Sequence, residues 1–71
     1  MTKYVHIAQV HPVELGEPNL VKVVAENEFD NKADADQWIE VYNLNPKQDR
    51  HGYPTKAVYL GRVNDATGEL E

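Results

Sequence analysis

The sequence predicts an α+β domain: a three-stranded antiparallel sheet with one helix packed on one face, in the order strand-strand-helix-strand. Three runs of β-branched and aromatic residues are separated by turn residues. One apolar stripe with helical spacing lies between the second and third runs. The chain has 71 residues, a length at which a protein forms a single domain near the lower limit for independent folding.

The first two strands are predicted at residues 4–10 and 20–27. The first run is closed by Pro12, which lacks a ladder donor and biases the residue before it towards extended backbone. The second run begins Leu-Val-Lys-Val-Val-Ala at Leu20. The connecting residues contain glycine and proline, so a hairpin with a wide loop is expected.

A helix is predicted at residues 31–43. Asp30 or Asn31 is a suitable N-cap, because either side chain can accept from a free amide of the first turn. Pro46 stops the helix at its other end. The apolar positions follow the i, i+3, i+4, i+7 pattern of an amphipathic helix, at Ala35, Trp38, Ile39 and Tyr42.

The third strand is predicted at residues 55–63, after a polar loop at 45–54. Gly61 within it indicates a bulge or a close backbone approach. Residues 65–71 are polar and are expected to form a flexible tail. Strand order 2-1-3 is favoured, and a meander of order 1-2-3 remains the alternative.

Composition narrows the function classes. Twelve acidic and seven basic residues give a formal charge of −5, which argues against non-specific binding to nucleic acid or to anionic membranes. No cysteine is present, so no disulfide or thiolate metal site can form. No apolar run is long enough to cross a bilayer, and the first residues lack a signal-peptide pattern. The expected location is the cytoplasm.

No catalytic constellation is visible in the sequence. His6 and His11 have opposite parity on the first strand, and His51 lies in a distant loop, so the three histidines are not expected to converge on a metal. The acids that crowd the junction between second strand and helix are read as a solvated helix N-terminus, or as a docking surface for a basic partner. We therefore expect a non-enzymatic protein without cofactor or metal.

The sheet itself suggests how the protein acts. Both faces of the predicted sheet carry apolar side chains, but a helix of about 13 residues, roughly 20 Å long, covers only one of them. A contiguous exposed apolar patch usually marks an interaction site. The alternative is that the polar loop or the C-terminal tail folds across this face, or that His6, Lys22 and Lys56 break up the patch. Self-association through that face, or strand addition at a free edge, would serve as well as a foreign partner. The candidate partner-binding residues are Tyr4, Ala8, Val10, Leu20, Val24 and Tyr59.

A second hypothesis is a small nucleic-acid-binding domain. The loop before the third strand carries the one basic cluster in the chain, and it includes an aromatic ring. Such a combination can place charge on phosphate and a ring on a base. The residues are Lys47, Arg50, His51, Tyr53 and Lys56.

The whole chain resembles the short accessory proteins encoded by bacteriophages and prophages. The resemblance rests on the acidic balance, on the strand-strand-helix-strand unit, and on its ending in Val-Tyr-Leu-Gly-Arg-Val-Asn at 58–64 followed by Thr-Gly-Glu at 67–69. It implies a regulator or inhibitor that binds a host machine, such as RNA polymerase, a nuclease or a replication factor. It carries no site residues across.

Overall fold

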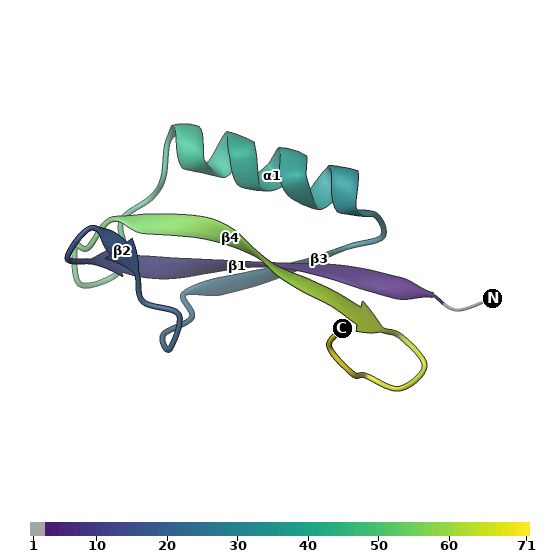
Figure 1. The fold of residues 1–71 in the computed structure, drawn as a ribbon. Helices are drawn as coiled ribbons and strands as arrows, with labels where there is room; N and C mark the ends of the chain where they lie inside the picture. Colours follow the sequence, from purple (N-terminus) through teal and green to yellow (C-terminus); the bar gives the residue numbers. More distant parts are fainter. Residues whose placement is uncertain (1–2) are drawn as a thin grey trace.

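The computed structural model describes residues 3–71 and shows an α+β fold with an antiparallel sheet and one helix (Figure 1). The elements are β1 (Tyr4–Glu14), β2 (Glu17–Pro18), β3 (Ala25–Phe29), α1 (Lys32–Leu44) and β4 (Thr55–Asn64). β1 lies in the middle: β2 and β3 pair with one of its edges, and β4 pairs with the other. The three long strands therefore follow the favoured order 2-1-3, and the meander is wrong.

β1 is longer than predicted, because Pro12 does not end it. The strand continues to Glu14, where a tight hairpin leads into β2. The carbonyl of Pro12 accepts from the amide of Asn19, 2.8 Å away, on the edge shared by β2 and β3. The backbone nitrogen and oxygen of one residue in a strand point to the same side, so the proline nitrogen faces the gap between β2 and β3. A missing donor is tolerated there.

The second long strand begins later than predicted. Residues 20–24 form a turn and an irregular segment, and β3 starts at Ala25. Pro12 supplies no amide to pair with this segment, and β2 already occupies the end of the same edge. The segment drops below the sheet, on the side away from α1, before it returns as β3 (Figure 1).

The helix forms where the sequence predicts it, one residue later at each end. Asn31 is the N-cap, and its side chain accepts from the amide of Asp34 at 2.9 Å. Ala35 is fully buried on the sheet, and the Trp38 ring packs between those of Phe29 and Tyr42 in tilted contacts. The predicted stripe is thus the packed face.

Polar contacts also join α1 to β4. The hydroxyl of Tyr42 lies 2.7 Å from the Thr55 hydroxyl. The Asn43 side-chain amide donates to the carbonyl of Ala57 at 3.0 Å and accepts from its amide at 2.8 Å. The last turn of the helix is therefore hydrogen-bonded to the backbone of β4, which fixes the position of the helix along the strand.

The face away from the helix is partly covered by the chain itself, contrary to the expectation that nothing covers it. Ile7 and His11 point to this face, yet they are 5% and 1% exposed. Figure 1 shows residues 20–24 below one end of the sheet and the C-terminal residues below the other. The tail expected to be flexible turns back, and Leu70 forms a β-bridge with Val63.

Candidate functional site

The six predicted partner-binding residues do not form one exposed surface. The helix covers the face that carries four of them. Ala8 and Val10 are 0% and 1% exposed there, so no partner can reach them while the helix is in place. Tyr4 and Tyr59 are half-buried on the same face. The other two, Leu20 and Val24, lie in the irregular segment and are 65% and 47% exposed.

Tyr59 has a structural role beneath the helix. Its hydroxyl lies 2.9 Å from Nδ1 of His6, and the two rings stack with centroids 6.1 Å apart. The ammonium of Lys32, from the first turn of α1, lies 4.9 Å from the centroid of the Tyr59 ring. A charged residue at position 59 would disturb the packing between helix and sheet as well as any contact with a partner.

Within residues 3–71, the segment Leu20–Val24 holds the densest group of exposed aliphatic side chains. Four of its five residues are aliphatic: besides Leu20 and Val24, Val21 is 92% exposed and Val23 is 50% exposed. Single exposed aliphatic residues are common on protein surfaces, but four within five positions form a patch. We call these five residues the apolar segment.

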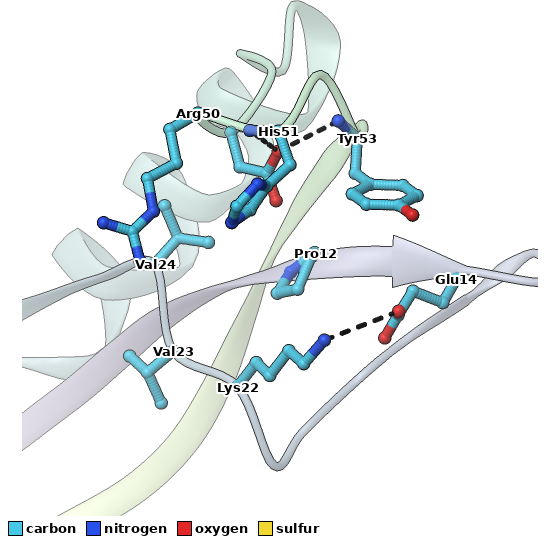
Figure 2. A pocket seen from close by; sticks show the side chains of 9 residues that line it. Pro12, Glu14, Lys22, Val23, Val24, Arg50, His51 and Tyr53 are labelled. Carbon is cyan, nitrogen blue, oxygen red and sulfur yellow. Dashed lines mark hydrogen bonds and ion pairs between the residues drawn. The ribbon is translucent and has the colours of Figure 1, made fainter.

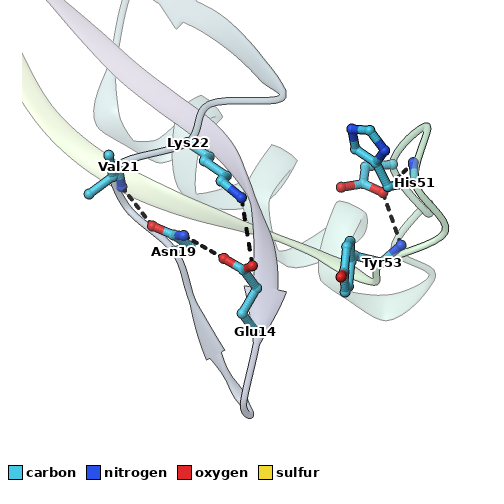
Figure 3. A network of polar contacts seen from close by, with 7 residues as sticks. Glu14, Asn19, Val21, Lys22, His51 and Tyr53 are labelled. Atoms are coloured by element: carbon cyan, nitrogen blue, oxygen red, sulfur yellow. Dashed lines mark hydrogen bonds and ion pairs between the residues drawn. The ribbon is translucent and has the colours of Figure 1, made fainter.

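The apolar segment is held in place by polar contacts at its base (Figure 3). The Asn19 side chain accepts from the amide of Val21 at 3.1 Å and donates to Glu14. Lys22 lies 3.7 Å from the same Glu14 carboxylate. The His11 side chain extends from β1 towards the segment, and its Nδ1 lies 2.6 Å from the carbonyl oxygen of Lys22. These contacts fix the backbone of the segment while its aliphatic side chains point to solvent.

A groove of about 640 Å³ runs between the apolar segment and the loop that follows α1 (Figure 2). The loop is shaped by Asp49, whose carboxylate accepts from the backbone amides of His51 and Tyr53 at 2.8 and 2.9 Å. This arrangement holds Tyr53, 49% exposed, across the groove from the segment. The groove is lined by Pro12, Glu14, Lys22, Val23, Val24, Asp49, Arg50, His51 and Tyr53.

The structure gathers three of the five residues predicted to bind nucleic acid. Arg50, His51 and Tyr53 line the groove, and Lys22, which the sequence did not single out, joins them. Lys47 is not part of the lining. Lys56 pairs with His11 and shares its face, away from the helix. The groove also contains two carboxylates, so it is not a purely cationic surface.

The histidines lie apart, as their parity predicts. His6 bonds to Tyr59 under the helix, His11 is buried on the opposite face, and His51 lies in the exposed loop. Across residues 3–71, no group of three histidine or acidic side chains is arranged to hold a metal ion.

Around the helix start, hydrogen bonding and Coulombic attraction from Asp36, 2.8 Å away, raise the pKa of Lys32 above its ordinary 10.5.

Sequence reasoning missed the groove because it is assembled from three separate stretches of chain. The sequence predicts residues 20–24 as part of a strand and not as an exposed segment, since Leu-Val-Lys-Val-Val is typical of a buried strand. One signal was available. Pro12 blocks ladder bonds on one edge of β1, and a strand placed beside it would lack partners at that point.

Comparisons with protein-family models, with curated proteins and with solved structures find no match to this chain. Within the part of the chain that the structure describes, no helix is long and apolar enough to cross a membrane.

Proposed function

We propose that this protein is a small non-enzymatic binding module that docks on a larger protein through the apolar segment and the groove beside it. The observation that carries the proposal is the exposure of four aliphatic side chains within Leu20–Val24. Complete burial of an aliphatic side chain contributes about 1.5–3 kcal/mol. Val23 and Val24 are already half-buried, so a partner that covers the segment gains most from Leu20 and Val21. Following the resemblance to phage accessory proteins, we propose that the partner is a host machine, such as RNA polymerase, whose output changes on binding.

The shape of the site supports a protein partner. A central aliphatic patch with an aromatic side chain and a charged rim is typical of protein interfaces. Here Tyr53 lines the same groove as Val23 and Val24. Arg50 and Lys22 add positive charge to its lining. Because the contacts at its base already hold the backbone of the segment, little conformational entropy is lost when it binds.

The proposal is tested by capture from a cell lysate with matched baits. The bait Val21→Asp/Val23→Asp places charge on two exposed positions of the apolar segment, where the side chains are 92% and 50% exposed. The control bait is Val41→Asp, the same exchange at a helix position that is 61% exposed. A protein retained by the wild type and by the control, but lost with the double variant, supports the proposal. Equal recovery with all three baits contradicts it.

Two further measurements separate the other hypotheses. Sedimentation equilibrium shows whether the wild type is a dimer that the Val21→Asp/Val23→Asp exchange dissociates, which would make the patch a contact between two copies. A mobility-shift titration at low salt tests nucleic acid. A complex that fades with salt and is lost in Arg50→Ala would favour the nucleic-acid hypothesis over docking on a protein.

A further inference from the structure

The outer edge of β3 is an unused hydrogen-bonding edge. Within residues 3–71, no other strand pairs with β3 on the side away from β1. The carbonyl of Val10 accepts from Val24 at 2.7 Å, so even-numbered residues of β1 direct their backbone groups to β3. Their partners in the register are Ala25, Asn27 and Phe29. The amides and carbonyls of Glu26 and Glu28 therefore point outwards.

The side chains of the same two glutamates reach over the face away from the helix. Glu26 accepts from the Gln9 side chain at 2.7 Å, and Glu28 pairs with Ile7 in the register. Both line a groove of about 290 Å³. Its apolar floor is formed by Val5, Ile7, Leu60, Val63 and Leu70.

This second groove is acidic and lacks a cation. Its charged lining residues are Glu26, Glu28 and Asp65, with no lysine, arginine or histidine among the lining residues. The two ion pairs found among the described residues, Lys22–Glu14 and Lys32–Asp36, involve none of these three carboxylates. A cation with an aliphatic stem would complement both the apolar floor and the acidic rim.

A second copy of the chain is a poor occupant of this edge. Two β3 strands joined antiparallel through their outward groups would pair Glu26 or Glu28 of one copy with Glu26 or Glu28 of the other. Like charges directly opposite one another destabilise a strand pair. Charged residues on an edge strand commonly prevent such self-pairing.

We infer that the edge of β3 receives an extended segment of a partner protein that carries lysine or arginine at alternate positions. Backbone bonds to Glu26 and Glu28 add the segment to the sheet as an extra strand. Its basic side chains on one side then lie across the two carboxylates, with their stems on the apolar floor. This inference rests on the proposed function, since it assumes a protein partner, but it concerns a different surface from the apolar segment.

The test uses a synthetic peptide of alternating lysine and threonine, with a glutamate-for-lysine peptide as its counterpart. Binding to the full-length protein is followed by backbone amide shifts in NMR titrations. The lysine peptide is expected to shift and protect the amides of Glu26 and Glu28, and the glutamate peptide is not. Methylation of the peptide nitrogens that face β3 should abolish binding, because it removes the backbone donors.

Matched variants separate the edge from simple charge attraction. In Glu26→Gln/Glu28→Gln, the loss of two ion pairs should weaken binding about fivefold to tenfold. Glu17→Gln/Glu40→Gln changes the net charge equally at positions away from the edge and should bind like the wild type. Equal weakening in both variants, or amide shifts at residues 20–24 instead of β3, would overturn the inference.

The proposed function and the inference about the β3 edge can be contradicted independently of one another. The variant Val21→Asp/Val23→Asp leaves β3 intact, so it should bind the lysine peptide like the wild type even where it no longer captures the partner. Loss of peptide binding in this variant would show that the peptide lies on the apolar segment, and would overturn the edge inference alone. If protein capture is lost only in Glu26→Gln/Glu28→Gln and not in Val21→Asp/Val23→Asp, the proposed docking through the apolar segment is wrong, while the inference about the β3 edge stands.

Discussion

His11 connects the sheet to the apolar segment. It is 1% exposed, and its Nδ1 lies 2.6 Å from the carbonyl of Lys22, whereas its Nε2 has no partner within the described chain. The exchange His11→Ala removes a buried ring and leaves that carbonyl without its donor. We expect a loss of about 2–4 kcal/mol in the free energy of unfolding, measured by urea denaturation.

A matched exchange checks the reason for this loss. His51→Ala changes the same residue type in the exposed loop, and it should alter the free energy of unfolding by less than about 0.5 kcal/mol. The His11→Ala protein should also be cut faster by protease within residues 20–24, because the segment loses its anchor. Similar stability of the two variants would show that His11 does not hold the segment.

Position 61 requires glycine for two reasons, its backbone conformation and its contact with Leu70. Its φ of 150° is unfavourable for other residues, and a Cβ there would lie 3.1 Å from Cδ1 of Leu70. It also lies at the β-bulge where the pairing of β1 and β4 shifts register. We expect Gly61→Ala to cost about 1–3 kcal/mol of unfolding free energy. In a chain that ends at residue 69 the cost should be smaller, since the contact with Leu70 is gone; an unchanged cost would place all of the strain in the backbone.

At the scale of elements, the sequence predicts well what depends on neighbouring residues. The helix is found within one residue at each end because its cap, its apolar stripe and its stop are local signals. The bulge at Gly61 is confirmed for the same reason. The predicted start of the second strand at residue 20 is wrong, because it depends on a residue in a different strand. Pro12 in β1 has no amide, so residues 20–24 lack a partner there and β3 starts only at Ala25.

The first turn of α1 gives a pH-dependent prediction. Asp36 raises the pKa of Lys32 through a hydrogen bond and charge attraction. A lysine pKa that is higher in the folded chain stabilises the fold below its ordinary value of 10.5, and this stabilisation is lost as the pH rises through the folded pKa. Asp36→Asn should return the pKa of Lys32 towards its ordinary value in an NMR titration of the lysine side chains. A change of the same size in the signals of lysines outside α1 would rule out a local effect.

At the scale of the whole molecule, alternation along the strands predicts which residues share a face but not which face the helix chooses. Both faces of β1 carry apolar residues, so either could have been covered. The helix lies over Ala8 and Val10, which are 0% and 1% exposed, so these two residues predicted to bind a partner are buried. Tail and segment then cover parts of the other face, through contacts that no local pattern records.

Amide hydrogen exchange tests this arrangement over the whole chain. β1 is paired on both edges, so its amides should exchange most slowly, through global unfolding. The amide of Val24 donates to the carbonyl of Val10 and should be partly protected, but the neighbouring amide of Val23 is outside the ladder and should exchange quickly. A continuous strand over residues 20–27, as the sequence alone predicts, would instead protect alternate amides throughout that range. Slow exchange at Val23, whose amide has no partner in this structure, would therefore remove the exposed apolar segment, and with it the docking surface proposed for this protein.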